Sequence, residues 1–177
     1  MGLPSCVLLN PRTAIRAPAD RDIPGLVALV NALAAEGSGL FILPINGPDG
    51  AETLRAHLAA ITRSGTEEVL VAEYGCELAG LLTATRGLHP ARRCVATIGV
   101  GVRAEDRRCG IGRALMEAIE EWAEDADISR LELTVAVTNR AAIALYKSCG
   151  YESEGVLRAS ARVDGAALDQ IMMAKLL

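Results

Sequence analysis

Aromatic residues, long apolar runs and an excess of basic charge are all lacking from this sequence. Trp, Tyr and Phe together make up 3% of its 177 residues. No apolar run reaches the ~18 residues that a transmembrane helix needs, and the first residues lack the basic segment of a secretory signal. The net charge of −4 argues against a general nucleic-acid binder, which needs a basic face to displace counterions from phosphates. We therefore expect no membrane partner and no nucleic-acid partner.

Paired cysteines are lacking as well. The chain has an odd number of cysteines, and no two of them form a C-x-x-C pair: Cys6, Cys76, Cys94, Cys109 and Cys149. This spacing indicates neither a disulfide framework nor a zinc site, so we expect no metal. Free thiols are typical of a reducing compartment, and we expect the protein to act in the cytoplasm.

The length and composition predict one domain. With 51% apolar residues, a chain of 177 residues can build one compact unit with a full core. We predict a loose leader over residues 1–11 and a single domain over residues 12–177.

Strand-like and helix-like patterns alternate along this domain. Apolar and β-branched runs predict strands at 14–17, 68–74, 78–86, 95–102, 131–137, 155–163 and 168–177. Helical spacing predicts helices that begin after Pro18, at Asp49, near Arg113 and at Asn139. Asp164 and Gly165 predict a hairpin turn between the last two strands. The strands at 95–102 and 131–137 are joined through a helix, so we expect them to be parallel.

The first two helices carry cap signals. Asp20 and Asp22 are competing N-caps of the first helix, which has Pro24 in its first turn and Gly37 as its expected stop. The second helix is expected to open with a capping box formed by residues 49 and 52. An apolar stretch at 40–43 lies among glycines and prolines between these two helices.

The stretch at 95–112 organises the rest of the chain. It combines a glycine-containing strand with a turn, Arg107-Arg108-Cys109-Gly110-Ile111-Gly112, that leads into a helix. Free N–H groups at a helix start bind anions, and we expect the glycines at 110 and 112 to leave room for a pyrophosphate there. A dinucleotide fingerprint would need a third glycine where Leu115 stands, and a Walker loop would need Gly-Lys-Ser/Thr.

Two motifs carry a family resemblance. Val102, Arg107, Gly110 and Gly112 match the pattern V-x-x-x-x-R/Q-x-x-G-x-G/A. Residues 139–151 match N-x-x-A-x-x-L-Y-x-x-x-G-F/Y at the right distance. Together these segments resemble motifs A and B of the GNAT superfamily of acyl-CoA-dependent N-acyltransferases, and they cover residues 95–151.

The resemblance implies the GNAT fold, an α/β (α+β) architecture. That fold has a central, mixed, mostly antiparallel twisted sheet of about six or seven strands flanked by about four helices. The sheet is splayed between the two parallel central strands, and CoA lies in the opening. The apolar stretch at 40–43 would border the acceptor pocket.

The resemblance also implies acetyl-CoA as a co-substrate and no metal. Backbone groups of Val100, Gly101 and Val102 would align with the pantetheine arm, as an added strand does. The pyrophosphate would lie on the helix start, with the predicted contacts Arg107, Arg108, Cys109, Gly110, Ile111, Gly112 and Arg113. Cys109 stands where relatives often carry Lys or Arg. Asn139 is an N-cap and, by resemblance, a CoA contact.

Tyr146 matches the tyrosine that in this family commonly protonates the departing CoA thiolate. With an ordinary pKa near 10, a tyrosine can donate a proton at neutral pH; packing beside the sheet is the alternative role. The general base stays open, because the position where N-terminal acetyltransferases often carry Glu is Thr134. Glu132, Glu73, His89 and a water relay are the candidates.

The last segment, residues 154–174, resembles the branch that contains L-amino-acid and phosphinothricin N-acetyltransferases. It implies acetyl transfer to the primary amine of a small, amino-acid-like molecule by direct attack. The alternatives are a protein acetyltransferase acting on N-termini or lysines, and a regulatory module that binds acyl-CoA without turnover. Many members of the family dimerise, so a homodimer stays open.

Overall fold

The computed structural model describes residues 13–36 and 43–177 and contains one seven-stranded sheet in the order β1-β2-β3-β4-β5-β7-β6. The strands are β1 (Thr13–Arg16), β2 (Glu67–Tyr74), β3 (Glu77–Arg86), β4 (Val95–Val102), β5 (Arg130–Ala136), β6 (Glu152–Val163) and β7 (Ala166–Leu176). The helices are α1 (Ile23–Ala35), α2 (Gly50–Ser64), α3 (Ile111–Asp125) and α4 (Arg140–Ser148). The predicted leader, the stop at Gly37 and residues 40–42 lie outside the described residues.

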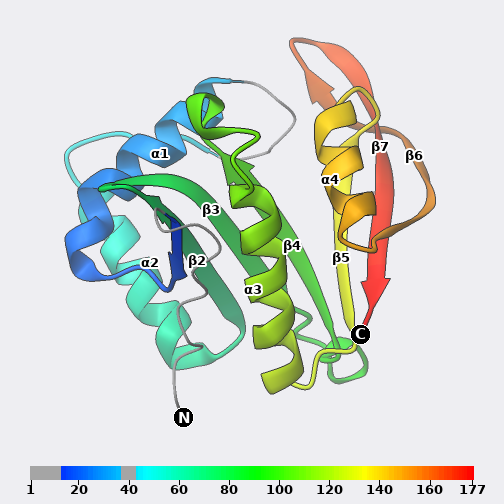
Figure 1. The fold of residues 1–177 in the computed structure, drawn as a ribbon, viewed down its shortest axis with the longest axis horizontal. Helices are drawn as coiled ribbons and strands as arrows, with labels where there is room; N and C mark the ends of the chain where they lie inside the picture. The colour runs from blue at the N-terminus through cyan, green and yellow to red at the C-terminus, as the bar shows by residue number, and fades with distance from the viewer. Residues whose placement is uncertain (1–12, 37–42) are drawn as a thin grey trace.

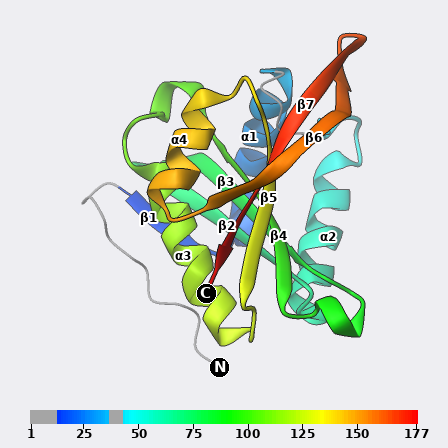
Figure 2. The same cartoon turned by 90° about the vertical axis from the view of Figure 1, so that its right-hand side faces the viewer.

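The sheet is covered on both faces (Figure 1). Figure 2 shows α3 and α4 on one side of the sheet and α2 on the other. The strand β2 follows this arrangement residue by residue, because successive side chains of a strand point to opposite faces. Val69 and Val71 pack in the cluster with α1 and α2, whereas Leu70 and Ala72 pack in the cluster with α3. The predicted fold class is confirmed.

The two central strands separate along their length. β4 and β5 are parallel, as predicted, but they pair only through Val95–Arg130, Ala96–Leu131 and Thr97–Glu132. Beyond these three pairs β4 remains joined to β3, and β5 remains joined to β7. The two strands therefore open toward the end of the sheet where α4 lies (Figure 1).

The hairpin of β6 and β7 forms the far edge of the sheet. Its turn is made by Asp164 and Gly165, both with positive φ, as the sequence predicts. β6 is the outermost strand, and most of its residues are exposed. Two register shifts, between Ser153 and Gly155 and between Leu157 and Ala161, interrupt its pairing with β7.

The predicted capping interactions were wrong for α1 and α2. Asp22 and Asp49 occupy the N-cap positions, but neither side chain caps its helix. The Asp22 carboxylate binds Arg16 instead, and Glu52, the other member of the predicted capping box, binds Arg55. Charge-assisted hydrogen bonds to a guanidinium are strong, so these ion pairs hold both carboxylates.

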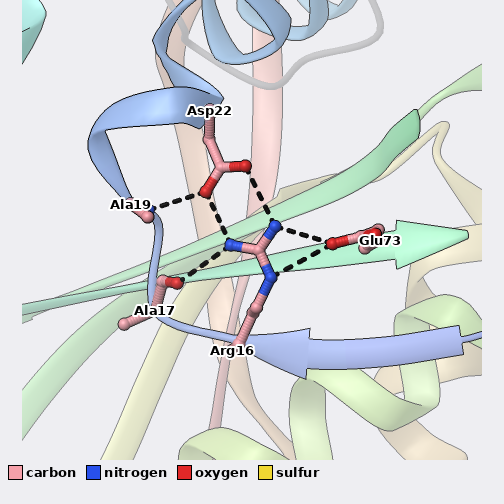
Figure 3. A network of polar contacts seen from close by, with 5 residues as sticks. All are labelled: Arg16, Ala17, Ala19, Asp22 and Glu73. Atoms are coloured by element: carbon pink, nitrogen blue, oxygen red, sulfur yellow. Dashed lines mark hydrogen bonds and ion pairs between the residues drawn. The ribbon is translucent and has the colours of Figure 1, made fainter. Parts of the chain in front are cut away.

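Arg16 at the end of β1 ties together three segments (Figure 3). Its guanidinium donates to both carboxylate oxygens of Asp22, at 2.6 and 2.9 Å, and to Glu73 of β2 at 2.7 Å. The Asp22 carboxylate also accepts from the backbone N–H of Ala19 at 2.6 Å. Because Arg16 stabilises the charged form, the pKa of Asp22 lies below its ordinary value. The network fixes the chain where it passes from the edge strand into α1.

Within residues 13–36 and 43–177, no helix is long and apolar enough to cross a bilayer.

We predict that Asp22→Asn lowers the free energy of unfolding at pH 7 by about 1–3 kcal/mol, because it removes a charged partner from a largely buried network. The folded pKa of Asp22 is depressed, so the stabilisation is complete above the ordinary Asp pKa near 4 and disappears as the pH falls through the folded pKa. Urea unfolding at pH 7 and pH 3 measures the difference.

Asp20→Asn is the matched control. Asp20 lies two residues away and also binds an arginine, Arg55, but its side chain is 75% exposed. Surface pairs of this kind contribute little. The interpretation is wrong if both variants lose the same stability, or if the loss in Asp22→Asn is the same at both pH values.

Candidate active site

The separation of β4 and β5 opens a cavity of about 920 Å³ that reaches from the α3 side of the sheet to Leu33 of α1. Its lining comes from both central strands, the start of α3, helix α4 and the tip of the β6–β7 hairpin. The lining residues include Leu33, Val100, Gly101, Val102, Asp106, Arg107, Arg108, Gly110, Ile111, Gly112, Arg113, Thr134, Thr138, Asn139, Tyr146, Ser148, Val163 and Leu168.

Backbone groups of β4 face this cavity. The N–H of Arg103 bonds to Ala79, on the β3 side. Because bonding direction alternates along a strand, the N–H and C=O groups of Val100 and Val102 point the other way, toward the opening. The carbonyl of Val102 accepts from Arg107 Nε at 3.0 Å, and the ladder with β5 has already ended. An extended ligand that carries amides can pair with this free edge.

The start of α3 presents backbone donors. The first intrahelical bond runs from Ala114 N to the Gly110 carbonyl at 3.0 Å, so the N–H groups of Ile111, Gly112 and Arg113 have no intrahelical partner. These donors and the positive end of the helix dipole form an anion site.

The two glycines of the turn have different structural roles. Gly110 has φ +86°, a conformation that other residues rarely adopt, although a Cβ there would meet nothing within 4 Å. At Gly112 a Cβ would lie 2.9 Å from Leu145 of α4. Gly112 therefore allows α3 and α4 to approach each other, in addition to any room that it leaves for a ligand.

The three arginines differ in their partners. Arg107 binds the carboxylate of Glu36 as well as the Val102 carbonyl. Arg113 donates to the side chain of Ser148 at 2.8 Å. Arg108 has φ +66°, and no hydrogen bond of its side chain occurs within the described residues. Cys109 is exposed, and it is the one predicted phosphate contact that does not line the cavity.

Tyr146 and Asn139 both come from α4 and its N-cap. Asn139 accepts from Ala142 N at 3.1 Å, which confirms the predicted cap. Tyr146 is 6% exposed, and its ring lies 6.2 Å from that of Tyr151, centroid to centroid. Burial, with a smaller effect of Cys149, raises the pKa of Tyr146 to about 12. Its hydroxyl makes no hydrogen bond within residues 13–36 and 43–177, so its proton is available to a ligand.

None of the three side-chain candidates for a general base lines the cavity. Glu132 lies where β4 and β5 are still paired and binds Arg92 and Arg130, at 2.6 and 2.9 Å. Glu73 belongs to the Arg16 network. His89 lies in the loop between β3 and β4, where its Nδ1 accepts from a backbone N–H. Thr134, by contrast, is exposed to the cavity.

Several cavity residues were not predicted from the sequence. They are Leu33, Asp106, Thr138, Ser148, Val163 and Leu168, of which Leu33, Ser148, Val163 and Leu168 belong to predicted helices or strands. Val163 and Leu168 flank the predicted hairpin turn, yet no local pattern indicates that this tip reaches the cavity. Only the arrangement of the strands brings them there.

In the part of the chain that the structure describes, no group of three or more His, Cys, Asp or Glu side chains is placed to bind a metal ion.

Known proteins that are similar in sequence to this chain include N-acetyltransferases. The L-amino acid N-acetyltransferase AaaT of Escherichia coli is 35% identical over 107 residues, which cover 60% of this chain and 66% of that protein. The ribosomal-protein-alanine N-acetyltransferase of Escherichia coli is 35% identical over 42% of this chain and 51% of its own length. The match thus spans less than two thirds of these curated relatives.

Solved structures resemble the whole fold. The ribosomal-protein-alanine N-acetyltransferase of Brucella melitensis has a TM-score of 0.81 and 29% identity, over 92% of this chain and 99% of that one. A phosphinothricin acetyltransferase of Sinorhizobium meliloti, solved with acetyl-CoA, has a TM-score of 0.82 at 18% identity, over 94% of this chain and 89% of that one. The second likeness concerns the fold alone.

The model of the acetyltransferase (GNAT) family matches residues 40–151, well over half of the sequence. Those residues include both motifs and all of β4, α3, β5 and α4, the elements that build most of the cavity. The chain belongs to the acetyltransferase (GNAT) family.

Proposed function

We propose that this protein is an acetyl-CoA-dependent N-acetyltransferase that acetylates the primary amine of a small, amino-acid-like molecule by direct attack. One observation carries the proposal: a single cavity is lined by the free edge of β4, the anion site of α3 and Tyr146. A thioester donor with a pantetheine arm and a diphosphate needs this combination of contacts.

The residues fit acetyl-CoA. Val100 and Val102 offer strand-like bonds to the pantetheine amides, and Gly101 adds no side chain between them. The N–H groups of residues 111–113 would hold the diphosphate, with Arg107, Arg108 and Arg113 supplying positive charge. Asn139 and Ile111 would border the cofactor as lining residues. Cys109 would contribute its backbone alone, because its side chain lies outside the cavity.

The remaining groups suit the transfer step. Bound acetyl-CoA supplies the thioester that the amine attacks. Tyr146 would donate its proton to the thiolate sulfur as the C–S bond breaks, and its raised pKa keeps that proton in place at neutral pH. No carboxylate among the described lining residues is free to act as a base, since Asp106 accepts from Arg103 at 2.6 Å. The amine would therefore give up its proton to water.

A second acceptor class has specific support. The relatives include ribosomal-protein-alanine N-acetyltransferases, which by name act on a protein. Against this class, position 134 carries Thr instead of Glu. The test is to incubate the protein with acetyl-CoA, small amines and N-terminal peptides, and to measure released thiol together with the acetylated product by mass spectrometry. Absence of product from every amine and peptide would overturn the proposed function.

We predict that Tyr146→Phe lowers kcat by about 10²- to 10⁴-fold, the usual contribution of a general acid, while the CoA dissociation constant changes little. The ring and its contact with Tyr151 are retained, so the fold is expected to survive. Tyr151→Phe is the control: its buried hydroxyl has no partner within the described residues, and it does not line the cavity. Equal losses in both variants would contradict the role of Tyr146.

The pH dependence follows from the raised pKa of Tyr146. Its proton is retained up to about pH 12, so kcat/KM is expected to rise with pH as the amine loses its proton, without a fall before pH 10. A falling limb below pH 10 in the wild type that is missing from Tyr146→Phe would show that Tyr146 titrates earlier.

We predict that Glu36→Gln tightens CoA binding by about two- to fivefold, because the Glu36 carboxylate competes with phosphate for Arg107. Calorimetry at low salt measures the change. Glu117→Gln is the matched control, since Glu117 lies 4.0 Å from Arg113 and holds it only weakly. An unchanged affinity in Glu36→Gln, or an equal gain in both variants, would show that Arg107 does not bind the phosphates.

A further inference from the structure

Three polar side chains form a row across β6, β7 and β5 that ends in the cavity. Ser160 Oγ donates to Gln170 Oε1 at 3.0 Å, and Gln170 Nε2 donates to Thr134 Oγ1 at 3.3 Å. Gln170 is paired with Ala136 in the ladder, which places Thr134 diagonally across from it on the same face. Gln170 is 5% exposed, whereas Thr134 is exposed and lines the cavity.

A bulge in β6 supports the outer end of this row. The register of β6 against β7 shifts between Leu157 and Ala161, and Ala159 within the shift has φ +51°. The N–H of Ala159 donates to Asp169 Oδ1 at 2.7 Å. A non-glycine residue in this conformation is strained, and bulges re-aim side chains near active sites. Here the bulge turns Ser160 toward Gln170.

The hydrogen bond from Gln170 determines that the Thr134 hydroxyl accepts on the β7 side and can donate on the cavity side. A threonine oxygen can accept two hydrogen bonds, and its hydroxyl group can donate one. Gln170 donates to the Thr134 oxygen, and no hydrogen bond of the Thr134 proton occurs in the described parts of the chain. Thr134 therefore offers a hydrogen-bond donor to the cavity at the point where β5 has just left β4.

The cavity lining around Thr134 on the α1 side is uncharged among the described residues. Leu33, Val163 and Leu168 are the lining residues contributed by α1 and the hairpin. The charged lining side chains of the described residues all come from the segment 106–113, beside the start of α3. A carboxylate next to Thr134 would be desolvated without a cation, which is costly, whereas a neutral oxygen would be matched by one donor.

We propose, on the basis of the proposed function, that Thr134 determines acceptor specificity by donating a hydrogen bond to a neutral carbonyl oxygen next to the reacting amine. The acceptor group is thus an α-amino amide, and Gln170 and Ser160 are positioning residues that orient the hydroxyl. This group occurs both in amino-acid amides and at peptide N-termini. The apolar walls select an apolar side chain on the same molecule.

The first test compares three amines that share one side chain: leucinamide, leucine and 3-methylbutylamine. Rates are referred to the concentration of unprotonated amine, because the three amines differ in pKa. We expect kcat/KM for leucinamide to exceed that for either of the others by about tenfold or more, because leucine brings a charge and 3-methylbutylamine lacks the oxygen. A higher value for leucine would overturn the proposal.

The second test uses Thr134→Val, which keeps the shape and removes the hydroxyl, with Thr134→Ser as the control that keeps the hydroxyl. We expect Thr134→Val to lower kcat/KM for leucinamide about tenfold and to leave 3-methylbutylamine within about twofold. Calorimetric binding of leucinamide in the presence of CoA should weaken to a similar extent, and Thr134→Ser should restore both values. An equal effect of Thr134→Val on both amines would contradict the role of Thr134.

A third comparison separates the two sources of the α-amino amide. A short peptide that begins with Leu carries the same group as leucinamide, so a preference for the peptide assigns the site to protein N-termini and a preference for leucinamide assigns it to a small molecule. Either preference supports the contact with Thr134. If leucine and 3-methylbutylamine are acetylated and neither amide is, the specificity proposal fails while the proposed function stands.

Discussion

The early end of the pairing between β4 and β5 is the constraint on which the rest of the structure depends. After three residue pairs the backbone of β4 is left with polar groups that β5 does not satisfy. Unpaired backbone groups are costly unless water or a ligand meets them. The opening is therefore both the entry for a ligand and the reason why the cavity passes from one face of the sheet to the other.

The two sides of the opening differ in charge. The α3 side has a helix start and three arginines, and one of these is already held by Glu36. Among the described residues, the α1 side has apolar walls and the hydroxyl of Thr134. Electrostatic attraction would favour an anionic donor on the first side, and the cost of desolvation would favour uncharged groups on the second. The chemistry of the two substrates would thus be assigned by separate elements of the fold.

Local patterns predicted the elements well and their side-chain partners less well. The order of strands and helices, the parallel pair, the hairpin turn at Asp164 and the cap at Asn139 are confirmed, because each depends on neighbours in the sequence. The side-chain caps at Asp22 and Asp49 were wrong: Asp22 binds Arg16, and Glu52, the expected partner in the capping box at Asp49, binds Arg55. Distant segments also supply Leu33, Gln170 and Ser160, which no local pattern connects to the opening.

The bulge of β6 has a consequence for behaviour at high protein concentration. β6 has 12 residues and one free edge, and a long, regular edge strand can recruit another chain into the same sheet. The two register shifts bend this edge and divide its free backbone groups into short runs. The same distortion would therefore disfavour edge-to-edge aggregation.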